Sequence, residues 1–278
     1  MTSLHKTNKK TKYIHLNLLV IFVTITWLLP VIWMFMNSFR DPSQTFYQGI
    51  IPDKFTLENY IKILRDPLML IAFRNSIIVS SSAALIDIIL ALLAAYGFSR
   101  FKFKGRSQLK LLLLIIRLYP GMVLAITIFQ LAGILNIYDS LIPIIFLNSL
   151  INLPFAVWML QSTIDALPIE LEEASWLDGI SRLRGIFKII VPIATPSIVA
   201  TFAFVFLLSW NEYLFAVTFI RSPENQLVTL KIAENIGQYH IDFIGLMATV
   251  TLATLPLMII FLWMQKHIVS GLSEGGVK

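Results

Sequence analysis

Six long apolar stretches dominate this chain of 278 residues. They lie near residues 14–37, 70–98, 109–134, 138–161, 193–220 and 244–266. A helix needs about 20 such residues to cross the hydrocarbon core of a bilayer. Because backbone polar groups find no water in that core, each stretch is predicted to be a helix. The expected fold class is therefore an all-α polytopic membrane protein with six transmembrane helices, in one transmembrane domain over residues 1–278.

The composition supports a membrane protein rather than a soluble domain. Hydrophobic residues make up 57% of the chain and charged residues only 14%, with a mean hydropathy of +0.77, whereas soluble domains carry about 25% charged residues. The absence of cysteine excludes disulfides and thiolate metal sites. We attribute the net charge of +6 to the basic loops that orient a membrane protein, rather than to binding of nucleic acid. Membrane lipid is thus an expected partner and nucleic acid is not.

Lysine and arginine are distributed unevenly among the segments that connect the stretches. The tail at 1–13, the loop after the second stretch, the loop at about 165–192 and the C-terminal end together carry fourteen, against six in the alternating segments. Cytoplasmic segments carry the excess of basic residues. Both termini, including a C-terminal tail at about 267–278, and the 165–192 loop are therefore predicted to be cytoplasmic.

The 165–192 loop is polar and has the pattern of two helices joined at a glycine. Leu171, Ala174 and Leu177 recur at spacings of three and four, together with Asp178, so they share one surface of a first helix. Gly179 permits the backbone to leave that helix. A second, basic helix follows. This arrangement predicts a stiff protruding elbow with an apolar knob, although an interfacial hairpin without a partner would show a similar pattern.

The spacing of this loop closely resembles the cytoplasmic coupling motif of ATP-binding-cassette importer permeases, usually written Glu-Ala-Ala, Gly, Ile-x-Leu-Pro. Ser175 and Val191 stand where the motif has Ala and Leu. The resemblance implies the architecture of a type I importer permease, in which the elbow inserts into a cleft on a separate ATPase subunit. The residues that it assigns to ATPase coupling are Glu173, Ala174, Ser175, Leu177, Asp178, Gly179 and Pro192.

Resemblance over nearly the whole chain narrows the expectation to maltose-type carbohydrate permeases. It is carried by Asn75-Ser76, by the segments 95–103, 210–215, 222–225 and 237–239, and by the C-terminal tail. In this family the segment before the last span, here about 221–243, approaches the sugar-binding protein; a connecting loop is the alternative. The tail is expected to reach toward the ATPase, unless it is a disordered end, through Gly271, Leu272, Gly275 and Gly276.

The chain contains no phosphate-binding loop of the form Gly, four residues, Gly-Lys-Ser/Thr. ATP and Mg are therefore expected on the partner ATPase, and we predict no cofactor, metal site or catalytic residue here. The resemblance implies a complex with a second homologous permease, two ATPase subunits and an extracytoplasmic binding protein. It would pass a sugar or oligosaccharide across the bacterial cytoplasmic membrane.

Charged and amide side chains inside the apolar stretches are candidates for function, because charges there are costly. Asp87 lies about 20 Å and Arg117 about 10 Å from the inner surface at 1.5 Å per residue. We predict that they form an ion pair between the second and third stretches. In the fifth stretch, a group of aromatic, amide and carboxylate side chains is predicted to line the path of the sugar. Structural hydrogen bonds to a neighbouring helix are the alternative role. The candidates are Trp210, Asn211, Glu212 and Tyr213.

Two other functions are compatible with parts of the sequence. Permeases for polyamines or inorganic anions share the coupling motif, but are not expected to carry the same C-terminal tail. An ion-coupled secondary transporter would use Asp87, Arg117 and Glu212 as a relay. That hypothesis leaves the 165–192 loop without a function.

Overall fold

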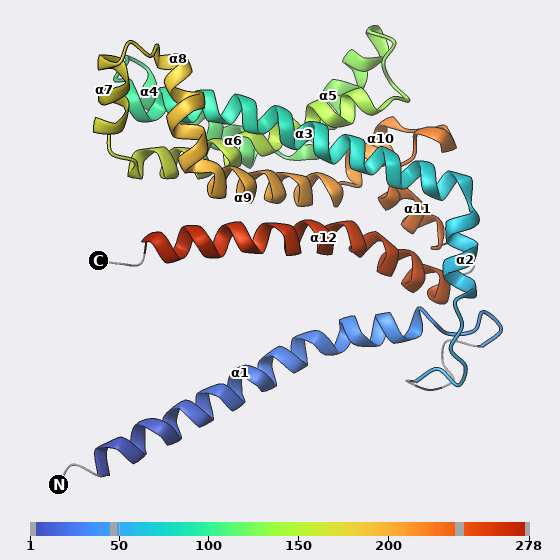
Figure 1. Cartoon of the computed structure of the whole chain (residues 1–278). Helices are drawn as coiled ribbons and strands as arrows, with labels where there is room; N and C mark the ends of the chain where they lie inside the picture. Colours follow the sequence, from blue (N-terminus) through green and yellow to red (C-terminus); the bar gives the residue numbers. More distant parts are fainter. Residues whose placement is uncertain (1–3, 45–48, 50, 237–241, 276–278) are drawn as a thin grey trace. The chain divides into compact units, whose positions relative to one another are not determined.

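The computed structural model describes residues 4–44, 49, 51–236 and 242–275, with side chains described from residue 15 to residue 265 of these ranges (Figure 1). The chain divides into two units, residues 1–65 with 235–252 and residues 66–234 with 253–278. The named elements of the described part are helices, and an isolated β-bridge joins Arg40 to Phe55.

The first unit contains α1 (Leu4–Asn37), α2 (Glu58–Arg65) and the start of α12 (Phe243–Gly275). α1 is apolar, and its side chains are exposed over residues 15–33. The segment after it is fixed by the fully buried Arg40. Its guanidinium donates to the Asn37 side chain (3.0 Å) and to the Gly49 carbonyl (2.9 Å).

The core of the second unit is formed by α3 (Pro67–Arg100), α6 (Leu141–Ala166) and α9 (Val191–Trp210), since α3 packs against both of the others. α3 begins where the Asp66 carboxylate accepts a hydrogen bond from the Leu68 amide (2.9 Å), with Pro67 in its first turn. Small side chains let the helices approach closely. Fully buried alanines of α3 are Ala72, Ala83, Ala84, Ala91 and Ala95.

The other elements of this unit are shorter, apart from the end of α12. They are α4 (Arg106–Leu118), α5 (Gly121–Ile134), α7 (Glu170–Leu177), α8 (Arg182–Gly185), the π-helix η1 (Ile186–Ile190), α10 (Leu214–Phe219), the 3-10 helix η2 (Pro223–Asn225) and α11 (Val228–Glu234).

Among the residues that the structure describes, five helices are long and apolar enough to cross a membrane, or six if one bent pair forms a span. This agrees with the predicted all-α membrane fold. The expectation of one continuous helix over residues 109–134 is wrong, because α4 and α5 meet at 92°. Pro120 has no N–H and disfavours helical backbone at Tyr119, which is extended (φ −71, ψ 133).

The fifth predicted stretch, residues 193–220, also differs at both ends. Helical structure begins at Arg182 and runs without interruption to Trp210 through α8, η1 and α9. Residues 211–213 are not helical, and α10 follows them. The span is therefore continuous with the second helix of the 165–192 loop.

Candidate functional site

The elbow predicted in the 165–192 loop is present, and the predicted apolar face of α7 is exposed. Leu177 is 90% exposed and Leu171 44% exposed, and Ala174 is exposed beside them. Glu173 is exposed as well, whereas Ser175 is buried. Most of the predicted coupling residues on α7 thus remain available to a partner, while Ser175 supports the helix from inside.

Gly179 turns the chain at the end of α7. Its φ of +76° lies in the left-handed region that glycine adopts without strain. The Gly179 amide donates to the Trp176 carbonyl (3.0 Å) and the Ile180 amide donates to the Ser175 carbonyl (3.0 Å). These two bonds make the Schellman motif that closes a helix. The corner is therefore a defined turn, with Asp178 exposed at the C-cap.

Replacing Gly179 by alanine is expected to destabilise the protein by about 1–2 kcal/mol, since an L-residue is strained in left-handed backbone. Gly133→Ala is the matched control. Neither glycine has an atom within 4 Å of the added methyl group, but only Gly179 has a positive φ. Thermal unfolding of the purified protein measures the difference. Equal changes in the free energy of unfolding of the two variants would show that a side chain at position 179 causes no backbone strain.

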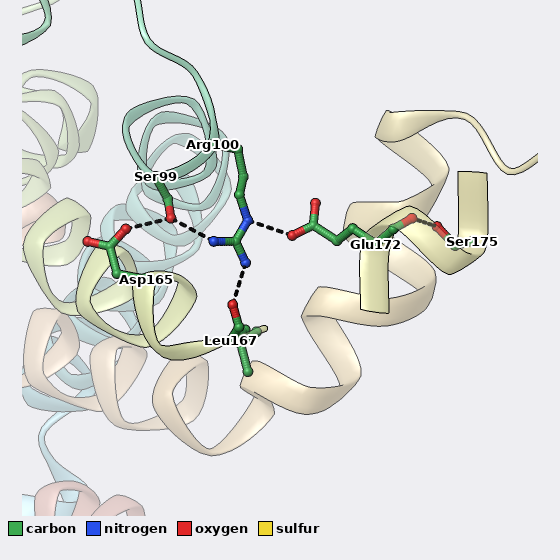
Figure 2. Close-up of polar contacts among 6 residues, drawn as sticks. All are labelled: Ser99, Arg100, Asp165, Leu167, Glu172 and Ser175. Carbon is green, nitrogen blue, oxygen red and sulfur yellow. Dashed lines mark hydrogen bonds and ion pairs between the residues drawn. The ribbon is translucent and has the colours of Figure 1, made fainter. Parts of the chain in front are cut away.

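The elbow is anchored to the end of α3 by Arg100, as Figure 2 shows. Its Nε donates to the Glu172 carboxylate (2.6 Å) and its Nη2 donates to the Leu167 carbonyl (2.9 Å). The two charged side chains are only 11% and 5% exposed. Beside this ion pair, the Ser99 hydroxyl donates to Asp165 at the end of α6 (2.5 Å). α3, α6 and α7 are thus joined by one polar network.

A second contact joins both arms of the elbow to the end of α3. The Arg182 guanidinium lies over the Trp176 ring at 4.7 Å and over the Phe101 ring at 5.2 Å. Cations are attracted to the faces of aromatic rings. Arg182 therefore connects α8 to α7 and to the residue that follows α3.

Pro192 is the second residue of α9 and is exposed. Pro192 has no N–H and so cannot donate a hydrogen bond to the preceding turn. The wider turns of the π-helix η1 lie directly before it, and there the Val191 amide donates to the Ile186 carbonyl. Helical structure nevertheless continues. A displacement of the elbow can therefore pass directly into the span that ends at Trp210.

The residues predicted to line a sugar path separate into two pairs. Trp210 is buried and stacks on Phe206 (5.7 Å), and the Glu212 carboxylate accepts hydrogen bonds from two amides at the start of α10 (2.5 and 3.1 Å). Asn211 and Tyr213 are exposed. Trp210 and Glu212 therefore hold the break between α9 and α10, and Asn211 and Tyr213 remain candidates for contact with a sugar.

The predicted ion pair between Asp87 and Arg117 is not formed. The two ion pairs among the described residues are Arg100–Glu172 and Lys231–Glu234. Asp87 is fully buried on α3, and neither carboxylate oxygen has a hydrogen-bond partner in the described part. The bend after Leu118 places Arg117 against the middle of α6 instead, where it donates to Ile151 and Asn152.

The approach of the C-terminal tail to the ATPase remains a prediction. α12 extends to Gly275 and so includes Gly271, Leu272 and Gly275 as helical residues. Gly276 lies outside the described residues, as do residues 237–241 of the segment that we expect near a binding protein.

At the start of α6, at the end of this helix opposite to the elbow, Asp139 holds two loops together. Its carboxylate accepts hydrogen bonds from the Arg221 amide (2.9 Å), the Ser222 amide (3.0 Å) and the Ser222 hydroxyl. Its carbonyl accepts a further bond from Asn225 (2.6 Å). The Ser222 hydroxyl, together with the two amides, lowers the pKa of Asp139 to about 2.

The contacts of Asp139 are expected to be independent of pH between 8 and 5. Because its pKa is lower in the folded state than the ordinary value of about 3.9, the stabilisation is complete above pH about 4 and is lost only as the pH falls toward 2. Limited proteolysis near residue 222 should thus be equally slow at both pH values and faster in Asp139→Asn, but not in the exposed control Asp53→Asn. Faster cleavage of the unaltered protein at pH 5 would contradict this.

Comparison with known proteins agrees with this geometry. The family described as binding-protein-dependent transport system inner membrane component matches residues 87–274. The inner membrane ABC transporter permease protein YcjP of Escherichia coli is 35% identical, covering 94% of each chain. The trehalose/maltose transport system permease protein MalG of Thermococcus litoralis is 34% identical, over 93% of this chain and 94% of that protein.

A solved structure shares the fold. The crystal structure of a bacterial ABC transporter involved in the import of the acidic polysaccharide alginate has a chain that superposes with a TM-score of 0.77 and 18% identity. The superposition covers 94% of this chain and 97% of the matched chain of the alginate transporter. At this identity the likeness shows the fold alone.

Proposed function

Since this chain belongs to the family of binding-protein-dependent transport system inner membrane components, we propose that it is a permease subunit that moves a sugar or oligosaccharide across the cytoplasmic membrane. Separate ATPase subunits would drive this transport. The names of relatives support a sugar, as they include trehalose/maltose, maltodextrin and trehalose transport system permeases. The chain itself would catalyse no reaction.

The observation that carries this proposal is the exposed face of α7. Leu177 is 90% exposed at the end of a helix that is anchored from behind by the ion pair of Arg100 and Glu172. An apolar side chain in that position gains stability when a partner covers it, at about 25 cal/mol per Å² of buried apolar surface. We infer that a cleft of an ATPase subunit is that partner.

The elbow would transmit the motion of the ATPase to the helices that line the translocation path. ATP closes the ATPase pair and displaces α7; the network around Arg100 and the continuous helix from Arg182 to Trp210 transmit the displacement. The spans then open outward and receive the sugar. We infer a complex with a second homologous permease, two ATPase subunits that hold ATP and Mg, and an external binding protein, with both termini of this chain in the cytoplasm.

Two other functions, a secondary transporter and a permease for a solute other than a sugar, receive less support. A proton or ion relay through Asp87 and Arg117 lacks its central contact in the described part of the chain. It also gives no role to the elbow. A polyamine or inorganic-anion permease would share the elbow, but the relatives' names favour a sugar.

The test is purification of the tagged chain from its native membranes, with and without Glu173→Lys. We expect an ATPase and a second permease to copurify, and the substitution of the exposed Glu173 to reduce recovery of the ATPase. Glu224→Lys, an equal charge change at an exposed external position, is the control. Reproducible recovery of this chain alone would contradict the proposal.

A further inference from the structure

Two breaks in membrane-spanning helices lie side by side in the second unit. α4 and α5 are bent apart at residues 119–120, and α9 and α10 are separated by residues 211–213. α5 packs against α10. A methyl group added at Gly121, directly after the first break, would lie 3.6 Å from the Phe215 ring of α10 and 3.7 Å from Ile151 of α6. The two breaks therefore meet against the middle of α6.

A short polar chain connects the two breaks. Arg117 lies in the last turn of α4 and donates through Nη1 to the Asn152 side-chain oxygen (3.3 Å) and to the Ile151 carbonyl (3.4 Å). The amide nitrogen of Asn152 donates to the Ser209 hydroxyl (3.4 Å), one residue before α9 ends. Asn152 is near the midpoint of α6, a helix long and apolar enough to cross a membrane, so the guanidinium lies near the middle of that span.

The charge of Arg117 has no acidic counterpart in the described part of this chain. Both ion pairs found there involve other residues, and its acceptors are a neutral amide and a carbonyl. Its side chain is exposed. An arginine at the centre of a bilayer costs about 2.5–3.5 kcal/mol on insertion scales, so such residues face water-filled cavities or partners rather than lipid.

We propose that Arg117 lines the translocation path and recognises an anionic group, so that the substrate is an acidic saccharide bearing a carboxylate, sulfonate, sulfate or phosphate. This rests on the proposed function as a sugar permease. Secondary transporters build substrate sites where discontinuous helices meet near the midplane, and the two breaks give this chain a similar arrangement. A guanidinium presents a planar set of donors that matches such groups with two parallel hydrogen bonds. Asn211 and Tyr213, exposed at the second break, would contact the neutral hydroxyls.

The charge can be tested without knowing the substrate, because the chain has no cysteine. Tyr119→Cys, at an exposed position beside the break, is reacted in the assembled complex with methanethiosulfonates that carry a sulfonate or a trimethylammonium group. We expect reaction with both reagents and preference for the sulfonate. Adding Arg117→Gln should reduce that preference by about tenfold, because a guanidinium about 6 Å away in water attracts the sulfonate and repels the trimethylammonium group. Arg117→Lys keeps the positive charge and should keep the preference.

Two results of this experiment would overturn the proposal. Absence of reaction at Tyr119→Cys, and also at Arg117→Cys, would place the break against lipid or protein. A preference that Arg117→Gln does not change would show that an acidic group of the second permease neutralises the guanidinium. Labelling is measured on this chain by mass, so cysteines of other subunits do not contribute.

The substrate class is tested by uptake in cells that express the complete importer, with digalacturonate as the acidic probe and maltose as the neutral probe. We expect Arg117→Gln to lower ATP-dependent uptake of digalacturonate at least about tenfold, the loss for one charged hydrogen-bonded contact. Uptake of maltose alone, unchanged by the substitution, would overturn the acidic substrate and leave the importer intact. Absence of ATP-dependent uptake of either probe would count against the proposed function, and the thiol experiment would still decide the charge.

Discussion

Glu172→Gln is expected to lower the free energy of unfolding by about 3–5 kcal/mol, because removing one partner of a buried ion pair leaves the other charge without compensation. The Arg100 side chain is only 11% exposed, and the Glu172 oxygen at 2.6 Å is the carboxylate that balances its charge. Since the same pair fixes α7 to α3, ATP-driven transport should also fall. Chemical or thermal unfolding of the purified protein and uptake in cells measure the two effects.

Glu173→Gln is the matched control for the change in the free energy of unfolding. It makes the same chemical change one residue further along α7, but at an exposed position, where substitutions usually change stability by less than about 0.5 kcal/mol. The double replacement Arg100→Met with Glu172→Leu should recover part of the stability, because an apolar pair replaces the buried charges. Equal losses in Glu172→Gln and Glu173→Gln would show that the ion pair does not anchor the elbow.

The ion pair also shows where prediction from the sequence ends. Arg100 and Glu172 are 72 residues apart, and each has an ordinary local role as a basic end of a span and an acidic residue of a helix's first turn. Only the packing of α3 against α6 brings the two helix ends together. The local signal was weak. Glu172 lies opposite the apolar face of α7, so if that face docks onto a partner the Glu172 side faces this chain, and a carboxylate buried there needs a basic partner.

The elbow itself was predictable because its determinants are local. The spacing of Leu171, Ala174 and Leu177 defines one face of a helix whatever the rest of the chain does, and Gly179 ends that helix through its own backbone. The predicted exposure of that face is confirmed.

The helix breaks were less predictable, because proline acts differently at different places. Pro154, Pro196 and Pro256 lie inside continuous helices, whereas Pro120 separates α4 from α5. In a membrane the neighbouring helices decide whether the backbone groups freed by proline are satisfied. The predicted contact of Arg117 with Asp87 failed for this reason, since the bend at Pro120 directs Arg117 to α6.

Leu177→Asp is expected to abolish ATP-driven transport without lowering the stability of the isolated chain. At 90% exposure Leu177 contributes almost nothing to packing within the chain, so the free energy of unfolding should change by less than about 0.5 kcal/mol. In the complex, full burial of a leucine stabilises by about 1.5–3 kcal/mol. Its loss alone weakens the interface with the ATPase by about 10- to 150-fold, and a desolvated carboxylate adds to this.

The controls separate an interface from a general effect of a new charge. Leu135→Asp introduces the same group at another exposed leucine, at the end of α5 and away from the elbow, and should leave recovery of the ATPase unchanged. Leu177→Met preserves apolar volume and should retain most of the transport. Copurification of the ATPase and sugar uptake are measured for all three variants. If Leu177→Asp transported at the level of Leu135→Asp, the exposed face of α7 would not be the surface on which the ATPase acts, and the exposed part of α8 would become the next candidate.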